Sequence, residues 1–98
     1  MQVKVYVAAN TTMANPPPTK YQFLFEQQVP GSRDLLPLPQ LETVADNALN
    51  IAVKPLVLAT GSYPTPSPIN WGSQSHFTAW RNYDFGLRNK YCVRVDIV

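Results

Sequence analysis

The chain has 98 residues, a net charge of +2 from eight basic and six acidic residues, and a charged fraction of only 14%. This length predicts one domain with a single core, and so small a net charge argues against a nucleic-acid-binding protein, for which a clearly basic domain is expected. Ordinary proteins have about 25% charged residues, so a surface this poor in charge favours burial against protein partners.

The N-terminal segment from Gln2 to Ala9 has the alternation of a half-buried strand. Val3, Val5 and Val7 fall on one face, and polar or aromatic residues fall on the other. No basic region followed by an apolar region is visible at this end of the sequence. We therefore expect a protein that is cytoplasmic when it is synthesised and that can be incorporated into a virion afterwards.

Residues 10–20 are predicted to form an extended, proline-rich arm. Pro16, Pro17 and Pro18 remove three backbone donors and hold φ near −65°, so this segment cannot be a central strand. A proline conformation that is fixed in advance lowers the cost of ordering the arm on a partner. We expect the arm to lie across a neighbouring subunit.

The segment from Tyr21 to Val29 is predicted to be a second strand, which ends at the turn residues Pro30 and Gly31. Strict alternation places its aromatic residues on one face, and we take this face as the core face. Its members are Tyr21, Phe23, Phe25 and Gln27.

The segment from Leu41 to Val53 fits two structures. Apolar residues recur there at helical spacing: Leu41, Val44, Ala45, Ala48, Leu49 and Ala52. However, Leu49, Ile51 and Val53 also alternate, and Pro55 favours the end of any helix nearby. We predict a short helix over Leu41 to Leu49 and a strand over Asn50 to Ala59, and an all-strand version fits nearly as well.

Residues 61–73 are predicted to form a long, stiff loop, since proline occupies every second position from Pro64 to Pro68. Long loops in compact domains are usually functional or disordered. A further strand is expected over Gln74 to Arg81, and a turn over Asn82 to Asn89. The clearest strand is Lys90 to Val98, whose apolar face is formed by Tyr91, Val93, Val95 and Ile97.

Short strands separated by proline-rich turns indicate a mainly β chain. We predict a single domain over residues 1–98, built as a small antiparallel β-sandwich or barrel of five to six strands. It would have long proline-rich loops and at most one short helix. No membrane association is expected, because the longest apolar stretch, Ala48 to Ala59, is too short to cross a bilayer.

The inventory of reactive side chains argues against an enzyme. A Cys–His dyad would require the single cysteine, Cys92, to meet the single histidine, His76. A structural zinc site would need about four such ligands. Glu42 and Asp46 stand at i, i+4, a pairing more typical of a solvated surface than of a catalytic pair. No phosphate-binding or nucleophile motif is present, so we predict no enzymatic activity, no cofactor and no metal.

Aromatic and basic residues are interleaved between Trp71 and Arg94, and most of these rings are expected to be core. The alternatives are a protein-binding patch, for which aromatics with Arg are the usual anchors, and a platform for single-stranded nucleic acid. The residues predicted to contact a partner are Pro16, Pro17, Pro18, Tyr63, Trp71, Trp80, Arg81, Tyr83 and Arg88.

Three functions follow from these observations. The first is a structural or interaction protein of a larger assembly, such as an accessory or cement-type subunit of a phage virion. It would be oligomeric, or bound to protein neighbours. The second is a small stoichiometric inhibitor or adaptor of one host protein, of the phage counter-defence type. The third is a single-stranded nucleic-acid-binding module, which the near-neutral charge makes the least favoured.

Overall fold

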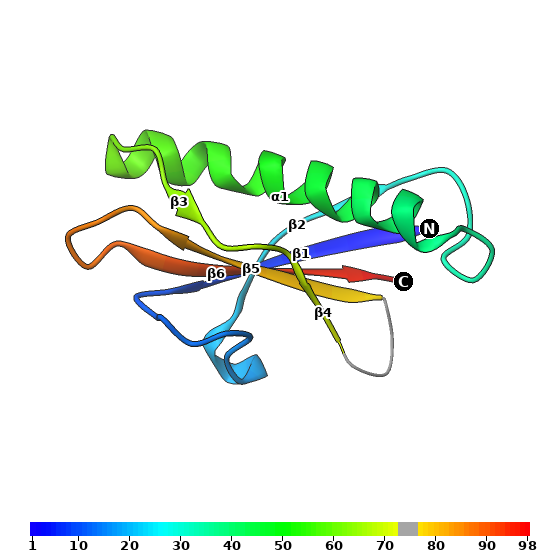
Figure 1. Cartoon of the computed structure of the whole chain (residues 1–98), viewed down its shortest axis with the longest axis horizontal. Coiled ribbons are helices and arrows are strands. Elements are labelled where there is room, and N and C mark those ends of the chain that lie inside the picture. Colours follow the sequence, from blue (N-terminus) through cyan, green and yellow to red (C-terminus); the bar gives the residue numbers. More distant parts are fainter. Residues whose placement is uncertain (73–76) are drawn as a thin grey trace.

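The computed structural model describes residues 1–72 and 77–98. Its strands form one antiparallel sheet in the order β2–β1–β6–β5–β3, and β4 also pairs with β5 (Figure 1). The elements are β1 (Gln2–Ala9), the 3-10 turn η1 (Pro18–Lys20), β2 (Gln22–Gln28), α1 (Leu38–Thr60), β3 (Thr65–Pro66), β4 (Asn70–Trp71), β5 (Thr78–Asp84) and β6 (Lys90–Ile97). The prediction of a mainly β chain is confirmed, but the helix of the described residues, expected to be short at most, spans 23 residues. Over the residues described, however, the sheet is single and open, and it forms neither a sandwich nor a closed barrel.

The core lies between α1 and the two central strands, β1 and β6. Alternate residues of these strands are buried on the sheet face that packs against α1, which we call the helix face: Val3, Val5, Val7, Val93, Val95 and Ile97. The apolar faces predicted for the two strands are therefore confirmed. Each side chain of this size stabilises the fold by about 1.5–3 kcal/mol when it is fully buried.

The prediction of a short helix followed by a strand is wrong, because residues 38–60 form one helix of 23 residues. The residues predicted to share a helical stripe are the ones that meet the sheet, and five are buried: Leu41, Ala45, Ala48, Leu49 and Ala52. The alternation at Leu49, Ile51 and Val53 does not mark a strand. In the helix it separates a buried residue, an exposed residue and a half-buried residue.

Pro55 lies inside α1 without ending it. Its ring is on the exposed side of the helix, while Leu56 and Val57 beyond it still pack against the core. Continued burial therefore offsets the hydrogen bond that proline cannot donate. The helix ends instead at Gly61, whose φ of 70° is left-handed and whose N–H donates to the Val57 carbonyl.

The aromatic face predicted for β2 does not form a single buried face. Phe25 pairs with Val5 and packs against the core, whereas Phe23 pairs with Tyr6 and is 56% exposed. The register shifts between these two pairs, so Leu24 is an extra residue in β2, a β-bulge. The bulge sends Phe23 to the outer face of the sheet, the face away from α1, although alternation alone puts it beside Phe25.

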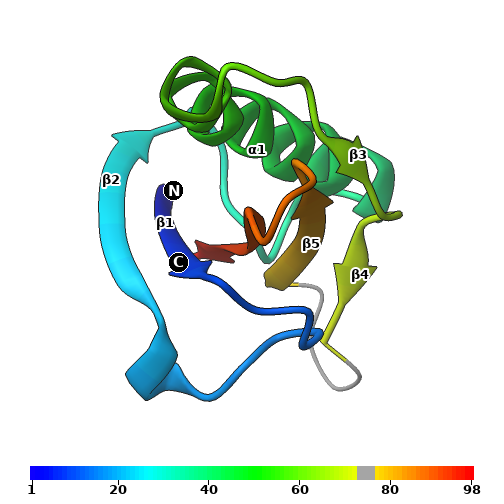
Figure 2. The ribbon, with the colours of Figure 1, turned by 90° about the vertical axis from the view of Figure 1, so that its left-hand side faces the viewer.

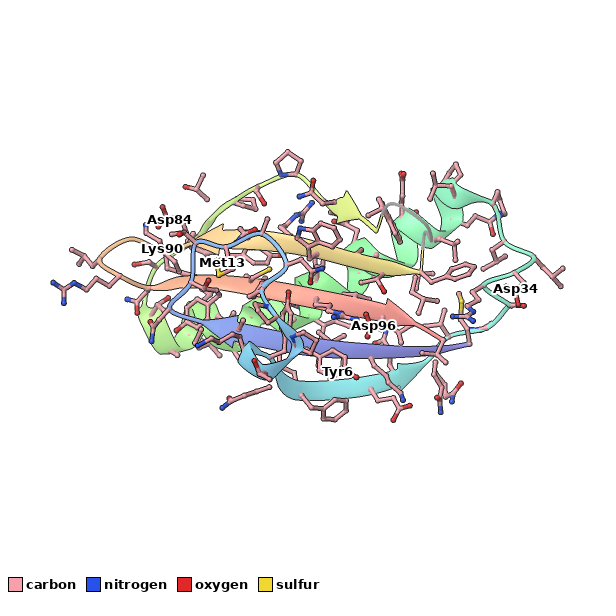
Figure 3. The ribbon with its side chains drawn as sticks, turned by 90° about the horizontal axis from the view of Figure 1, so that it is seen from below. Tyr6, Met13, Asp34, Asp84, Lys90 and Asp96 are labelled. Carbon is pink, nitrogen blue, oxygen red and sulfur yellow. The ribbon has the colours of Figure 1, made fainter. Side chains whose placement is uncertain are left out.

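The proline-rich arm folds back onto its own sheet instead of projecting from it. It crosses the outer face below β6 and β5 (Figure 3). The Thr11 N–H donates to the Lys90 carbonyl at 3.0 Å, and the Asn82 amide donates to the Met13 carbonyl at 2.9 Å. Within the arm, the Pro16 side chain is fully buried. Because the arm is held by its own sheet, it does not lie free to cover a neighbour in this conformation.

The segment after α1 lies along β5 and is hydrogen bonded to it. The Ser67 N–H donates to the Asn82 carbonyl, and the Gly72 N–H donates to the Thr78 carbonyl. The short strands β3 and β4 lie on either side of the first of these contacts. Part of the strand predicted over residues 74–81, including His76, and the last residue of the predicted loop, Ser73, lie outside the described residues.

Candidate functional site

The residues predicted to contact a partner do not gather on one surface. Trp80 and Arg81 are consecutive in β5 and therefore lie on opposite faces of the sheet. Arg81 is on the helix face, where its Nη1 is 3.5 Å from Asp46 Oδ1 of α1. Trp80 is on the outer face opposite Arg94 of β6. Tyr83 is only 4% exposed and belongs to the core, so it contacts no partner in this conformation.

The other predicted residues are spread over three regions. Pro17 and Pro18 are exposed in the arm, while Pro16 is buried. Tyr63 is 89% exposed at the C-terminal end of α1, beside a hollow of about 580 Å³ that Val53, Val57 and Leu58 also line. Trp71 packs partly against the core, and Arg88 is exposed in the hairpin between β5 and β6.

The outer face carries an aromatic and charged cluster beside the arm (Figure 3). Tyr6 meets Phe23 edge-to-face at 5.7 Å and Tyr21 at 6.5 Å. Arg94 donates two hydrogen bonds to Asp96, at 2.7 and 3.1 Å. The Asp96 carboxylate raises the pKa of the Arg94 guanidinium further above its usual value. The charges of this cluster are therefore satisfied within the chain.

Tyr21 joins this cluster to the arm. Its hydroxyl donates to Asn15 Oδ1 at 3.0 Å and lies 3.4 Å from Cys92 Sγ. Burial is the main cause that raises the pKa of this hydroxyl well above its usual value, and the contact with Cys92 adds to it. Cys92 itself is completely buried in β6. We assign these contacts to holding the arm in place, because Cys92 is completely buried and Arg94 is paired with Asp96.

The two edges of the sheet differ in how they are protected. Figure 2 shows β2 on one side of the molecule and β3 with β4 on the other. On that second side, β3 and β4 are only two residues each, and Pro64, Pro66 and Pro68 flank or interrupt them. Short edge strands and proline are devices that block the addition of a further strand. The edge beyond β5 is therefore closed to such pairing.

The β2 edge has almost none of this protection. Among the described residues, β2 pairs only with β1. It spans seven residues and contains no proline, no lysine and one charged residue, Glu26. Phe23 is 56% exposed and Leu24 is 37% exposed along it. The bulge at Leu24 is its one protective feature, since it interrupts the regular ladder. An exposed apolar edge of this kind is a template for a strand from another chain.

The backbone groups that the β2 edge offers follow from its pairing with β1. Val29 donates its N–H to Met1 O at 2.9 Å, and the Met1 amino group donates to Val29 O at 2.8 Å. In an antiparallel ladder both backbone groups of a residue point to the same side, and the side alternates along the strand. Phe25, Gln27 and Val29 therefore face β1, while Glu26 and Gln28 direct their N–H and C=O groups outwards.

Two further kinds of site were sought in the described residues, a metal centre and a membrane-spanning helix. No three His, Cys, Asp or Glu side chains come together there in a group that could hold a metal ion. Within the same residues, no helix combines the length and apolarity needed to span a membrane.

Comparison with known proteins gives no family for this chain. No protein-family model, no curated protein and no solved structure matches it.

The β2 edge was not among the residues predicted to contact a partner. Its one visible signal is composition: Gln22 to Gln28 combines three large apolar residues with three glutamines and one charge. A strand of that composition would be unsafe at an exposed edge unless a partner covers it. Nothing in the segment itself, however, tells an edge strand from a central one.

Proposed function

We propose that this chain is a non-enzymatic structural or interaction protein, which works inside a larger assembly by offering its β2 edge to another protein. One observation carries the proposal: the opposite edge of the sheet is closed by short proline-rich strands, whereas β2 is left open with Phe23 and Leu24 exposed. Because proteins usually protect both edges of an open sheet, an edge left apolar and unprotected favours a partner that covers it.

The distribution of charge supports a protein partner over a nucleic acid. Four of the eight basic residues are in ion pairs within the chain: Arg33 with Asp34, Arg81 with Asp46, Lys90 with Asp84, and Arg94 with Asp96. Arg33 also lies over the Phe77 ring, 4.4 Å from its centre. Phosphate binding would use such cations on one face, and here Trp80 and Arg81 lie on opposite faces.

Fractionation of the native source tests the proposal. A tagged copy of the chain should sediment with a particle or complex much heavier than itself. Glu26→Pro should move it to the free fraction, because proline removes an N–H that points outwards from β2 and leaves the pairing with β1 intact. Thr19→Ala, at an exposed position of η1, is the control and should sediment like the parent protein.

The pattern of recovery separates the three functions. A repeating particle would support a structural subunit, and a virion is the assembly that we propose first. One defined host protein at a one-to-one ratio would support the inhibitor or adaptor instead. Binding to single-stranded nucleic acid that falls steeply with salt would contradict both protein-binding functions. Substrate turnover by the pure protein would contradict the non-enzymatic proposal altogether.

A further inference from the structure

We propose that the partner at the β2 edge is a second copy of this chain, whose β2 pairs antiparallel with the first about a two-fold axis at Gln27. This inference rests on the proposed function, because it takes the β2 edge as the binding surface and adds the identity and register of its occupant. The two sheets would join into one continuous sheet, with both α1 helices on the same side of it.

The bulge limits which part of β2 can take part. From Phe25 to Val29 the strand is regular, with Phe25, Gln27 and Val29 on the helix face and Glu26 and Gln28 on the outer face. Before Phe25 the extra residue Leu24 breaks the alternation. After Val29 comes Pro30, which has no N–H to donate. A new strand can therefore form a regular ladder with residues 25–29.

The backbone geometry removes half of the possible registers. Residues that face each other in an antiparallel ladder must both direct their backbone groups towards the new strand, or both away from it. Only Glu26 and Gln28 of this segment direct them outwards. In a symmetric antiparallel pair, the numbers of any two facing residues add up to the same total. Because Glu26 and Gln28 both have even numbers and must face each other or themselves, this total must be even. The two-fold axis must consequently pass through a residue and not between two residues.

Only one of the remaining axes satisfies the side chains. An axis at Glu26 places two Glu26 carboxylates directly opposite each other, which is destabilising. An axis at Phe25 pairs Glu26 with the bulged Leu24, and an axis at Gln28 pairs Glu26 with Pro30. An axis at Gln27 pairs Glu26 with Gln28 of the second copy twice, so that four backbone hydrogen bonds form. It also pairs Phe25 with Val29 on the helix face.

The charges fit this register. Glu26 faces a neutral glutamine across the new interface, and within its own sheet it is opposite Lys4 of β1. Glu26 is the single charged residue of β2, so in this register no two like charges face each other directly across the two β2 strands. The two Glu26 side chains are diagonal to each other, a weaker interaction than a directly opposed pair.

The closed opposite edge makes the assembly finite. A sheet that could add strands at both edges would grow into a fibre. Here the edge beyond β5 is covered by the short strands β3 and β4, so pairing at β2 uses the available edge of each copy once. The expected product is a closed dimer and not a lattice. Such a dimer would be the unit that enters the larger assembly.

Disulfide formation at the axis tests the register directly. The two Gln27 residues would form a non-hydrogen-bonded pair with Cα atoms about 4.5 Å apart, a separation that suits a disulfide. We expect Gln27→Cys to give at least ~10-fold more covalent dimer under mild oxidation than Gln28→Cys, whose symmetric copies lie diagonally apart. The native Cys92 is completely buried and contributes no background. Adding Glu26→Pro should remove the Gln27→Cys dimer.

Light scattering and a check of folding complete the experiment. The parent protein should have the mass of a dimer, and Glu26→Pro the mass of a monomer with an unchanged circular dichroism spectrum. Equal cross-linking at positions 27 and 28, or a monomeric parent, would overturn the self-pairing. If the parent protein were a monomer, but Glu26→Pro were lost from the native complex, the proposed function would stand with a different occupant of the β2 edge. If Glu26→Pro stayed in the native complex like the parent protein, the β2 edge would not be the binding surface at all.

Discussion

Arg81 of β5 and Asp46 of α1 are 35 residues apart in the chain, and their Nη1 and Oδ1 atoms lie 3.5 Å apart across the junction of helix and sheet. The Arg81 side chain is 18% exposed and that of Asp46 is 46% exposed. The pair fixes one flank of α1 over β5, which leaves the opposite flank facing β1 and β2. The i, i+4 spacing of Glu42 and Asp46 predicts a solvated surface but does not show that Asp46 also pairs with Arg81.

We expect Asp46→Asn to lower the free energy of unfolding by about 1 kcal/mol, since the pair is partly screened by solvent. The substitution leaves the half-buried Arg81 without its carboxylate. Glu42→Gln, at an exposed position one turn earlier in α1, should change stability by less than about 0.5 kcal/mol. Urea denaturation measures both. Equal effects of the two substitutions would show that the Arg81–Asp46 pair contributes nothing.

Pro55 offers a way to stabilise the protein. Proline at this position leaves the Ile51 carbonyl without its helical donor, so Pro55→Ala should raise the free energy of unfolding by roughly 1–3 kcal/mol. Pro39→Ala is the matched control, because Pro39 lies in the first turn of α1, where proline is tolerated. Both substitutions loosen the unfolded chain to a similar extent. The difference between them in urea denaturation therefore reports the helix, and no difference would contradict this account.

The strands at the centre of the sheet were readable from sequence because they are central. β1 and β6 each have a strand on both sides and α1 over one face, so Val3, Val5, Val93 and Val95 are all completely buried. At the sheet edge this rule fails. In the part of the chain that the structure describes, β2 has a partner on one side only, and the bulge at Leu24 moves Phe23 to the outer face. A bulge leaves no trace in the alternation of the residues themselves.

The error in α1 and the packing of the arm on its own sheet, which was not predicted, have a common physical cause. Whether Pro55 ends a helix depends on what lies beyond it, and here Leu56 and Val57 pack against the core. Whether a proline-rich arm is free depends on contacts with distant residues, such as Asn82 in β5. Neither is visible in a local pattern. The β2 edge escaped prediction for the same reason, because strand order is a property of the whole sheet.

The contacts of the arm can be followed through Cys92. This thiol is completely buried, and Tyr21 joins it to Asn15 of the arm. Tyr21→Ala removes these contacts, so local opening should become easier. We expect labelling of Cys92 by a maleimide to become ~10-fold faster under native conditions, the effect of about 1.4 kcal/mol. Lys20→Ala, at an exposed neighbouring position, should leave the rate unchanged. An unchanged rate in Tyr21→Ala would show that the arm does not protect the thiol.

We expect the free energy of unfolding to fall at alkaline pH because of two tyrosines, Tyr21 and Tyr83. Burial raises the pKa of Tyr83 in the core and is the main cause that raises the pKa of Tyr21 beneath the arm. In the unfolded chain a tyrosine loses its proton near pH 10, while the folded chain retains it. The free energy of unfolding therefore falls as the pH rises above about 10, by up to about 1.4 kcal/mol per pH unit for each tyrosine. Solvent screening reduces the effect for Tyr21, which is only half-buried. Urea denaturation between about pH 9 and pH 11 should show a gentler slope for Tyr83→Phe and for Tyr21→Phe than for the parent protein. Identical slopes in all three proteins would show that other groups control the alkaline transition.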